Sequence, residues 1–241
     1  MESKPASTAG VSELLAVQVR LLRSPIHVCF SHEGDCMADD EKVLCVLASR
    51  AKSVLNAMNG ESLSANKYDP NAGDRLNELL MQTAHVARSS CETDEGLVQI
   101  IPYIVVRYHD SVLCYQRENG GEKRLDGKWS VGFGGHVNDQ DGSYLDGLRR
   151  EGQEELLGFS HGSLTEPLGF IWDNSNAVGR VHLGVLHAYQ FGQFGSPPVA
   201  PAEACRTRWE PTRLVAFDSR LENWSKIAVK IIQEWGHGRD F

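Results

Sequence analysis

Three glutamates, Glu151, Glu154 and Glu155, lie within five residues of a segment that follows a glycine pair, Gly134 and Gly135. On a helix the spacings i, i+3 and i+4 place all three side chains on one face. Like charges on one face repel one another unless a cation lies between them. Mg²⁺ prefers oxygen ligands and is commonly shared between carboxylates and substrate phosphates. The spacing therefore indicates either a metal site or an acidic helix face that is open to solvent.

The residues around these glutamates predict a helix that packs on a sheet. Ser143 and Asp146 have the spacing of a capping box, and Gly158 is placed to end the helix. The apolar side expected to dock on the sheet comprises Leu145, Leu148 and Leu156. The glycine pair leaves room for backbone N–H groups to approach a phosphate, or for the helix to lie close to the preceding strand.

The same stretch resembles the Nudix box, whose pattern is G-x5-E-x7-R-E-U-x-E-E-x-G-U, with U an aliphatic residue. The matching positions are Gly135, the pair Arg150-Glu151, the pair Glu154-Glu155, and Gly158-Phe159. The flanking stretches GKWSVGFGGH and VGRVHLG are similar to a bacterial branch of MutT-like phosphoesterases. The resemblance covers residues 96–241. It implies an α/β fold, a Nudix-like α/β/α sandwich with a mixed sheet.

Four departures from that pattern concern the loop and the packing of the helix. The early glutamate position holds Gly142, and the nearest acid is Asp141. The spacing from Gly135 to Arg150 is one residue longer than the pattern, and one extra residue stands before the closing glycine. The aliphatic position after the central glutamate holds Gly152, which costs about 1 kcal/mol in a helix relative to Ala. Because the early glutamate is mainly structural in the family, its loss affects the expected loop geometry more than the metal ligands.

The resemblance implies a hydrolase that cleaves a diphosphate linkage, NDP-X to NMP plus P-X, with Mg²⁺ or Mn²⁺ as cofactor. The implied metal ligands are Glu151, Glu154, Glu155 and the carbonyl of Gly135. The implied catalytic residues are Glu151, Glu154, Arg150 and Glu203. Arg150 is expected to orient the carboxylates, with Arg149 as the alternative if the inserted residue shifts the register. Glu151, or a carboxylate outside the box, is expected to take a proton from the attacking water.

In the family the outside acid often lies in the loop before the last strand. Glu203 and Glu210 are the candidates here, and Glu203 is preferred because it lies further inside the loop. The expected substrate-binding residues are Gly134, Gly135, His136 and Lys128, with Arg180 as a further partner for phosphate. For His136, a hydrogen-bonded turn histidine is an equally good interpretation.

Other histidines and aromatic residues are expected to pack rather than to react. His182 and His187 lie in strand-like sequence, and Trp129 is a core candidate. Phe170 and Trp172 could stack on a base, but aromatic residues that flank a strand are more often packing residues.

The composition of the whole chain limits its partners. The 241 residues are 41% hydrophobic and 23% charged, which is ordinary for a globular protein. A net charge of −8 argues against generalised binding to nucleic acid or to an anionic membrane. No apolar run approaches the ~20 residues of a membrane span, and no secretory signal is expected. A phosphate-bearing substrate is not excluded, because a bound divalent cation can neutralise its charge locally, and the resemblance implies a small, nucleotide-derived diphosphate.

The six cysteines are scattered and never form CxxC, which is typical of reduced thiols in a cytoplasmic protein. A group of zinc-type residues comprises Cys29, His32, Cys36 and Cys45. Their spacing lacks the close ligand pairs of common zinc modules, so packing as small apolar side chains is favoured.

The chain is expected to divide into a mostly helical N-terminal segment of unknown role, 1–95, and a Nudix-like hydrolase domain, 96–241. The helices expected in the first part cover 11–22, 38–58 and 74–89, with a short strand at 26–30. Apolar and β-branched runs after residue 95 predict strands, among them LVAF at 214–217. A closing helix is expected from the capping box formed by Ser219 and Glu222.

Three functions are compatible with these features. The first is a metal-dependent diphosphate hydrolase. The second is a catalytically weakened Nudix-fold binding or regulatory module, which Gly142 and the two inserted residues would favour. The third is an acidic helix on an unrelated α/β fold. The apolar helix expected at 41–58 would suit a homodimer surface, and the substrate itself is not named by the sequence.

Overall fold

The computed structural model describes residues 41–56, 65–117, 125–159, 162–191, 200–201 and 206–236, all within one compact unit, Asp39–Phe241. Its strands are β1 (Lys42–Leu47), β2 (Ala84–Ala87), β3 (Leu97–Tyr108), β4 (Ser111–Gln116), β5 (Trp129–Ser130), β6 (Gly132–Phe133), β7 (Leu156–Leu157), β8 (Gly162–Leu164), β9 (Gly169–Ile171), β10 (His182–Phe191), β11 (Ala200–Pro201) and β12 (Thr207–Pro211). Its helices are α2 (Ala48–Asn56), α3 (Ala72–Leu80), α4 (Arg88–Cys91), α5 (Tyr144–Glu155), α6 (Ala177–Arg180), α7 (Thr212–Val215) and α8 (Asn223–Gly236).

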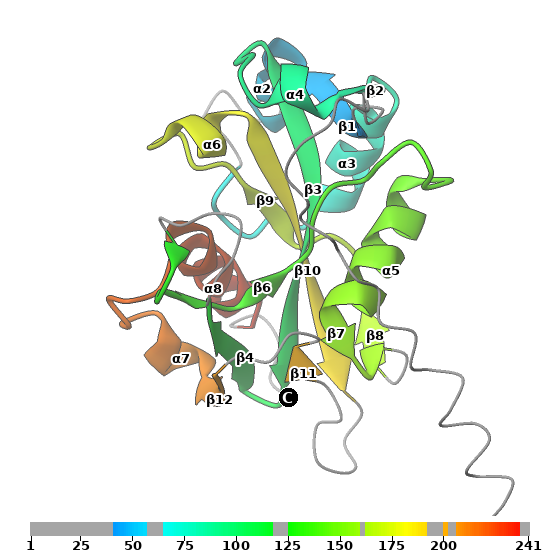
Figure 1. The fold of residues 1–241 in the computed structure, drawn as a ribbon. Coiled ribbons are helices and arrows are strands. Elements are labelled where there is room, and N and C mark those ends of the chain that lie inside the picture. Colours follow the sequence, from blue (N-terminus) through cyan, green and yellow to red (C-terminus); the bar gives the residue numbers. More distant parts are fainter. Residues whose placement is uncertain are drawn as a thin grey trace, which may run out of the picture. The chain divides into compact units, whose positions relative to one another are not determined.

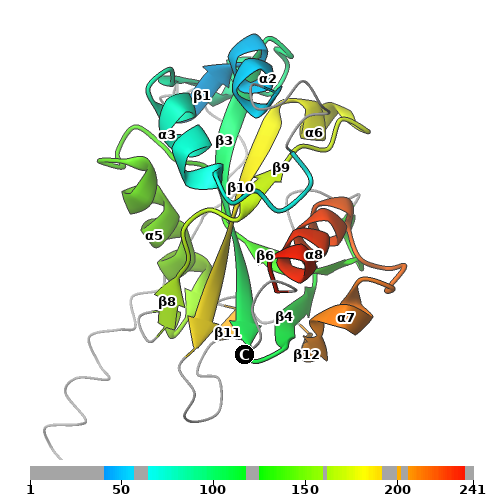
Figure 2. The ribbon, with the colours of Figure 1, turned by 180° about the vertical axis from the view of Figure 1, so that it is seen from behind.

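The long strand β3 is the axis of a ten-stranded sheet (Figures 1 and 2). One edge of β3 pairs in turn with β1, β6 and β4, all antiparallel. Its other edge pairs in parallel with β10, from Gln99 opposite His182 to Arg107 opposite Gln190. Parallel and antiparallel pairs therefore share one sheet, and the mixed sheet expected from the sequence is confirmed.

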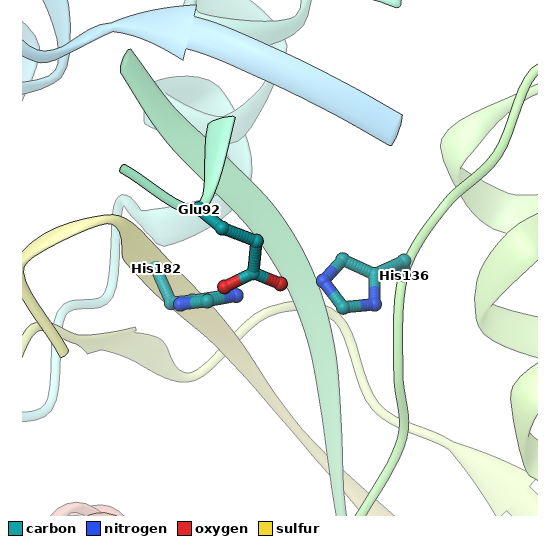
Figure 3. A group of neighbouring side chains, drawn as sticks. All are labelled: Glu92, His136 and His182. Carbon is teal, nitrogen blue, oxygen red and sulfur yellow. The ribbon is translucent and has the colours of Figure 1, made fainter. Parts of the chain in front are cut away.

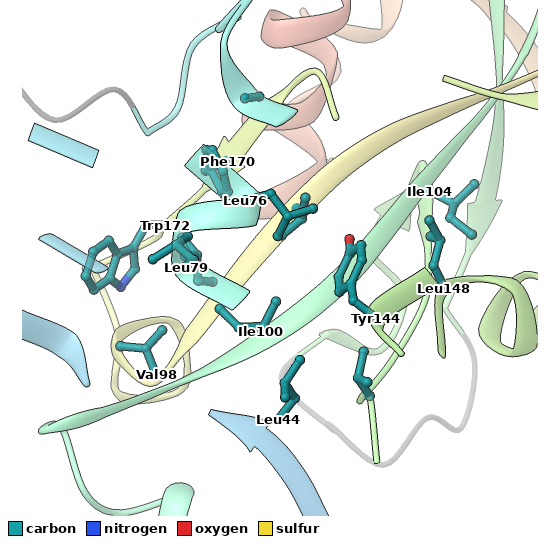
Figure 4. Packing of buried hydrophobic residues seen from close by; sticks show 14 of the residues in the cluster. Leu44, Leu76, Leu79, Val98, Ile100, Ile104, Tyr144, Leu148, Phe170 and Trp172 are labelled. Atoms are coloured by element: carbon teal, nitrogen blue, oxygen red, sulfur yellow. The ribbon is translucent and has the colours of Figure 1, made fainter. Parts of the chain in front are cut away.

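Side chains of β3 alternate between two buried clusters, one on each face of the sheet. Ile104 packs in the first cluster with Leu148 of α5, and the apolar sides of α2 and α3 belong to the same cluster (Figure 4). Val105 packs in the second cluster with Ile231 of α8. Because a strand turns successive side chains to opposite faces, helices cover both sides of the sheet. The α/β/α sandwich is confirmed.

The helix expected over 38–58 is wrong in its first half. Lys42–Leu47 is a strand with four consecutive buried residues, and only Ala48–Asn56 is helical. A short apolar run that is buried on both faces fits a strand as well as a helix, and periodicity alone does not separate the two. Pairing with β3 and β2 decided between them.

Three further element predictions are corrected. The helix expected over 74–89 is divided into α3, β2 and α4. The strand expected at 214–217 is wrong, since its first residues belong to helix α7. The last helix begins at Asn223, and Glu222 caps it by accepting hydrogen bonds from the backbone N–H groups of Trp224 and Ser225 at 2.8 Å each. The capping role of Glu222 is thus retained, while a helix start at Ser219 is wrong.

The part of the segment 1–95 that the structure describes contributes to the same sheet and core. The boundary expected at 95 and 96 lies between α4 and β3, and β1 on one side of it pairs with β3 on the other. Val54 and Leu55 are buried in the chain's own core, so they do not form the homodimer surface expected there. The helix expected at 11–22 and the strand at 26–30 lie outside the described residues, as do Cys29, His32 and Cys36.

No helix among the described residues is long and apolar enough to cross a membrane.

Candidate active site

Helix α5 carries the three glutamates, and its start is built as the sequence predicts. Ser143 Oγ accepts from the backbone N–H of Asp146 at 3.2 Å and donates to the Asp146 carboxylate at 2.7 Å. The helix ends at Glu155, three residues before Gly158, because Leu156 already adopts extended backbone. Leu148 is buried as expected, whereas Leu145 is 51% exposed and does not dock on the sheet. The N-cap by Ser143 is confirmed, and the expected end of the helix is wrong.

The glycine pair brings the loop after β6 close to both β3 and α5. Gly134 has φ of +142°, and a Cβ there would lie 2.0 Å from the Pro102 carbonyl oxygen of β3. A Cβ at Gly135 would lie 2.7 Å from Glu151 Oε2. Only glycine has the required conformation and lack of bulk at the first position. The pair therefore permits close packing of strand, loop and helix.

The guanidinium of Arg150 connects the loop to the helix. Its Nε and Nη2 donate to the two carboxylate oxygens of Asp141 at 2.9 Å each, and Nη2 also donates to the carbonyl of His136 at 2.7 Å. Its Nη1 donates to Glu151 at 2.8 Å and to Glu154 at 3.0 Å. The hydrogen bonds from Arg150 hold the pKa of Asp141 below its usual range. Such a bidentate pair fixes the orientation of the guanidinium as well as its position.

The three glutamates differ in environment. Glu151 is buried, and this burial raises the pKa of its carboxyl to about 7, an effect that Arg150 opposes and Glu154 and Glu155 reinforce. Glu154 and Glu155 are exposed on the same side of α5. A buried carboxylate beside two others, with one arginine between them, is a set of hard oxygen donors that fits a divalent cation.

The fold of the chain is similar to that of a solved structure. The crystal structure of Tm1382, a provisionally assigned Nudix hydrolase, superposes with a TM-score of 0.61 at 30% identity, over 81% of this chain and 99% of that one. The chain belongs to the Nudix family. Protein YmaB of Bacillus subtilis (strain 168) is also similar, at 36% identity over 174 residues, which cover 66% of this chain and 84% of YmaB. No family model matches the chain.

The departures from the Nudix box have local explanations. Asp141, adjacent to the glycine at the early glutamate position, is the acid that pairs with Arg150. Gly152 faces the ring of Phe159, since a Cβ on it would lie 2.3 Å from Phe159 Cζ. That ring stacks on Tyr189 with the centroids 4.5 Å apart. The aromatic side chain thus occupies the space that an aliphatic residue at 152 would need.

Replacing Gly152 by Ala is expected to lower the free energy of unfolding by about 1–2 kcal/mol. The clash with Phe159 costs about 1–3 kcal/mol, and the gain in helix propensity of about 1 kcal/mol offsets part of it. In a Phe159→Leu background the same change is expected to be neutral or stabilising. Urea denaturation of the four proteins of this double-mutant cycle measures the coupling. Equal effects of Gly152→Ala in both backgrounds would contradict this explanation.

The raised pKa of Glu151 predicts a stability effect between pH 4.5 and 7 in metal-free protein. In this window the folded chain binds the proton more tightly than the unfolded chain, so Glu151 lowers the free energy of unfolding as pH rises, by at most about 3 kcal/mol. The lowered pKa values of His136 and His187 act in the opposite direction. The measured quantity is therefore the difference in the free energy of unfolding between wild type and Glu151→Gln. It is obtained from urea denaturation with chelator at pH 5 and at pH 8.

The free energy of unfolding of Glu151→Gln, relative to that of wild type, is expected to be higher at pH 8 than at pH 5. The exposed control Glu78→Gln is expected to show the same pH dependence as wild type. A constant difference between wild type and Glu151→Gln would show that Glu151 titrates near its ordinary pKa of 4.5.

The expected substrate residues lie in different surroundings. Burial lowers the pKa of His136 to about 3, so its ring is neutral at pH 7 in the chain without ligand, and its role toward phosphate stays a prediction. Lys128 is exposed and hydrogen bonded through its backbone to Leu125 and Arg117. Arg180 forms an ion pair with Glu95 at 2.7 Å. The roles of Lys128 and Arg180 toward phosphate stay predictions.

The remaining candidates are placed as follows. Glu203 lies outside the described residues, and Glu210 belongs to strand β12, where it pairs with Arg208 at 3.3 Å. Arg149 is exposed and reaches Asp146 at 3.5 Å, so Arg150 rather than Arg149 contacts the glutamates. Trp129, Phe170, Trp172 and His187 are buried, in agreement with their expected packing roles.

Proposed function

We propose that this chain is a metal-dependent hydrolase that cleaves the diphosphate linkage of a nucleoside diphosphate derivative, NDP-X, into NMP and P-X. The observation that supports this most strongly is the joint placement of Glu151 against Gly135 and of Arg150 between Glu151 and Glu154. It places a buried carboxylate of α5 against the glycine-rich loop and links that carboxylate to the exposed Glu154 through one guanidinium. A solvated acidic helix face would need neither the buried glutamate nor the arginine.

The proposed metal ligands are Glu151, Glu154, Glu155 and the carbonyl of Gly135. When bound there, Mg²⁺ or Mn²⁺ would neutralise diphosphate charge and lower the pKa of a bound water. Asp141 and the His136 carbonyl hold Arg150 independently of the glutamates, so the carboxylates can turn toward a cation without releasing the guanidinium. Arg150 thereby acts as a positioning residue.

The proton of the attacking water would go to Glu151 or to a carboxylate outside the box. Glu151 is suited to this role by its position, because it lies against the glycine loop where the diphosphate would bind. Glu203 remains the proposed outside acid, ahead of Glu210. The N–H groups of Gly134, Gly135 and His136 would contact phosphate oxygens, and Lys128 would add positive charge to a chain whose net charge is −8.

Turnover of a substrate panel tests this function. Purified protein would be given nucleoside triphosphates, dinucleoside polyphosphates, nucleotide sugars and NADH, with Mg²⁺ or Mn²⁺ and a phosphate-coupled readout. Cleavage that requires the cation and yields NMP supports the proposal and begins to name the substrate. If the cation binds at α5 and no member of the panel is cleaved, the weakened Nudix-fold binding or regulatory module becomes the better description.

A further inference from the structure

A second group of metal-type ligands lies outside the glutamate face of α5. Glu92 follows helix α4, His136 follows the glycine pair, and His182 begins strand β10. One ligand atom from each of the three side chains lies within 4.8 Å of the other two. Figure 3 shows the Glu92 carboxylate and the two imidazole rings facing one another, with His136 directed away from α5. The group is therefore separate from Glu151, Glu154 and Glu155.

Both histidines present an unused nitrogen to this group. The Nδ1 of His182 donates a hydrogen bond to the carbonyl oxygen of Val178 at 2.7 Å, so Nε2 is the ring nitrogen left for an ion. Nε2 of His136 is buried and has no hydrogen-bond partner among the described residues. In Figure 3 a ring nitrogen of His136 points toward Glu92. His182 thus has an arrangement that is common in metal-binding histidines, in which one ring nitrogen donates to a backbone carbonyl and the other is left for the ion.

The charges around the group also suit a cation. Arg88 is bonded to Glu92 Oε1 at 3.3 Å, but its shorter contact, 2.9 Å, is with Glu41. The Oε2 atom of Glu92 has no hydrogen bond among the described residues and is available as a ligand. A divalent ion would thus lie beside the Glu92 carboxylate and two imidazole rings, while the Arg88 guanidinium is held more closely by Glu41.

We propose that Glu92, His136 and His182 bind one divalent transition-metal ion, with zinc the best match. Two imidazoles and one carboxylate are a donor set that zinc accepts with a fourth position left for water, whereas Mg²⁺ prefers oxygen ligands alone. In a tetrahedral zinc site with metal–ligand distances of about 2.0–2.1 Å, neighbouring ligand atoms lie roughly 3.4 Å apart. The ligand atoms here lie within 4.8 Å of one another, so zinc binding would shorten these distances by about 1.4 Å at most. Rotation of the exposed Glu92 side chain can supply much of this movement. The ion would connect α4, the glycine loop and β10.

Zinc binding by the purified full chain tests the site. The protein would be stripped with chelator and titrated with Zn²⁺ in excess Mg²⁺, which keeps the glutamates of α5 occupied. We expect wild type to bind one equivalent more than His182→Gln, and Glu92→Gln to weaken that equivalent by at least about 100-fold. Zinc should also raise the melting temperature of wild type more than that of either variant. Because Glu92 is exposed, its substitution tests the site even if His182→Gln folds poorly.

Two controls separate this site from others in the chain. His85→Gln removes an exposed histidine on β2 and should bind zinc as wild type does. Co²⁺ loaded in place of zinc should give visible absorption without thiolate charge-transfer bands, since no cysteine is a ligand. The proposal is overturned if Glu92→Gln and His182→Gln keep wild-type zinc stoichiometry and affinity, or if the cobalt spectrum shows thiolate ligation that both variants retain.

Discussion

Replacing Glu154 by Gln is expected to lower kcat for diphosphate cleavage by roughly 10²–10⁴-fold. A bound divalent cation contributes several kcal/mol of transition-state stabilisation, and each ~1.4 kcal/mol lost is a tenfold loss of rate. Glu154 is proposed as a ligand of that cation, and Gln removes the negative charge with little change in shape. Its side chain is 60% exposed and its ion pair with Arg150 is at the surface, so stability should change by less than about 1 kcal/mol.

The measurement is steady-state kinetics over a range of Mg²⁺ concentrations, with urea denaturation of the same samples. Glu78→Gln, an exposed glutamate on α3, is the matched control and should have wild-type kcat. If Glu154→Gln retains wild-type kcat at every Mg²⁺ concentration, Glu154 is not a ligand of a catalytic ion. Recovery of kcat at high Mg²⁺ would instead show that the residue serves mainly to bind the cation.

Gly134→Ala is expected to lower the free energy of unfolding by about 3 kcal/mol or more. The added Cβ would lie 2.0 Å from the Pro102 carbonyl oxygen, and this contact is with backbone that cannot rotate away. The φ of +142° is also a conformation that L residues rarely adopt, and forcing an alanine into it adds strain. Urea or thermal denaturation measures the loss.

Gly73→Ala is the control for this substitution, because it adds the same methyl group within helix α3. Nothing lies within 4 Å of a Cβ at Gly73, so the change should stabilise the protein by about 0.5–1 kcal/mol. A Gly134→Ala protein as stable as wild type would mean that the loop can move away from β3. In that case the position of Gly135 against Glu151 would not depend on the backbone of Gly134.

The glutamate helix was predictable because its signals are local. The cap at Ser143 and the spacing of the glutamates act within one or two helical turns, so they do not depend on tertiary contacts with the rest of the chain. The mixed sheet followed from the Nudix resemblance. The partner of Arg150 was harder to predict, since the early acidic position holds glycine, although Asp141 beside it was the one available signal.

The order of strands and helices before residue 95 was not predictable in the same way. The run KVLCVL is apolar enough for a buried helix, and only its pairing with β3 and β2 makes it a strand. Such pairing joins residues far apart along the chain, and no short window of sequence contains it. Packing likewise explains why Leu145 is exposed while Leu148 is buried.

By itself the sequence determined that three carboxylates share one helix face behind a glycine loop, which makes that face the place to test for cation binding. Tertiary structure alone decided that Glu151 is buried while Glu154 is exposed, and that Asp141 fixes Arg150. It also decided that Glu92, His136 and His182 meet. The physical reason is the range of the interactions: helix spacing and capping act over a few residues, whereas desolvation and ligand convergence depend on segments that only the folded sheet brings together.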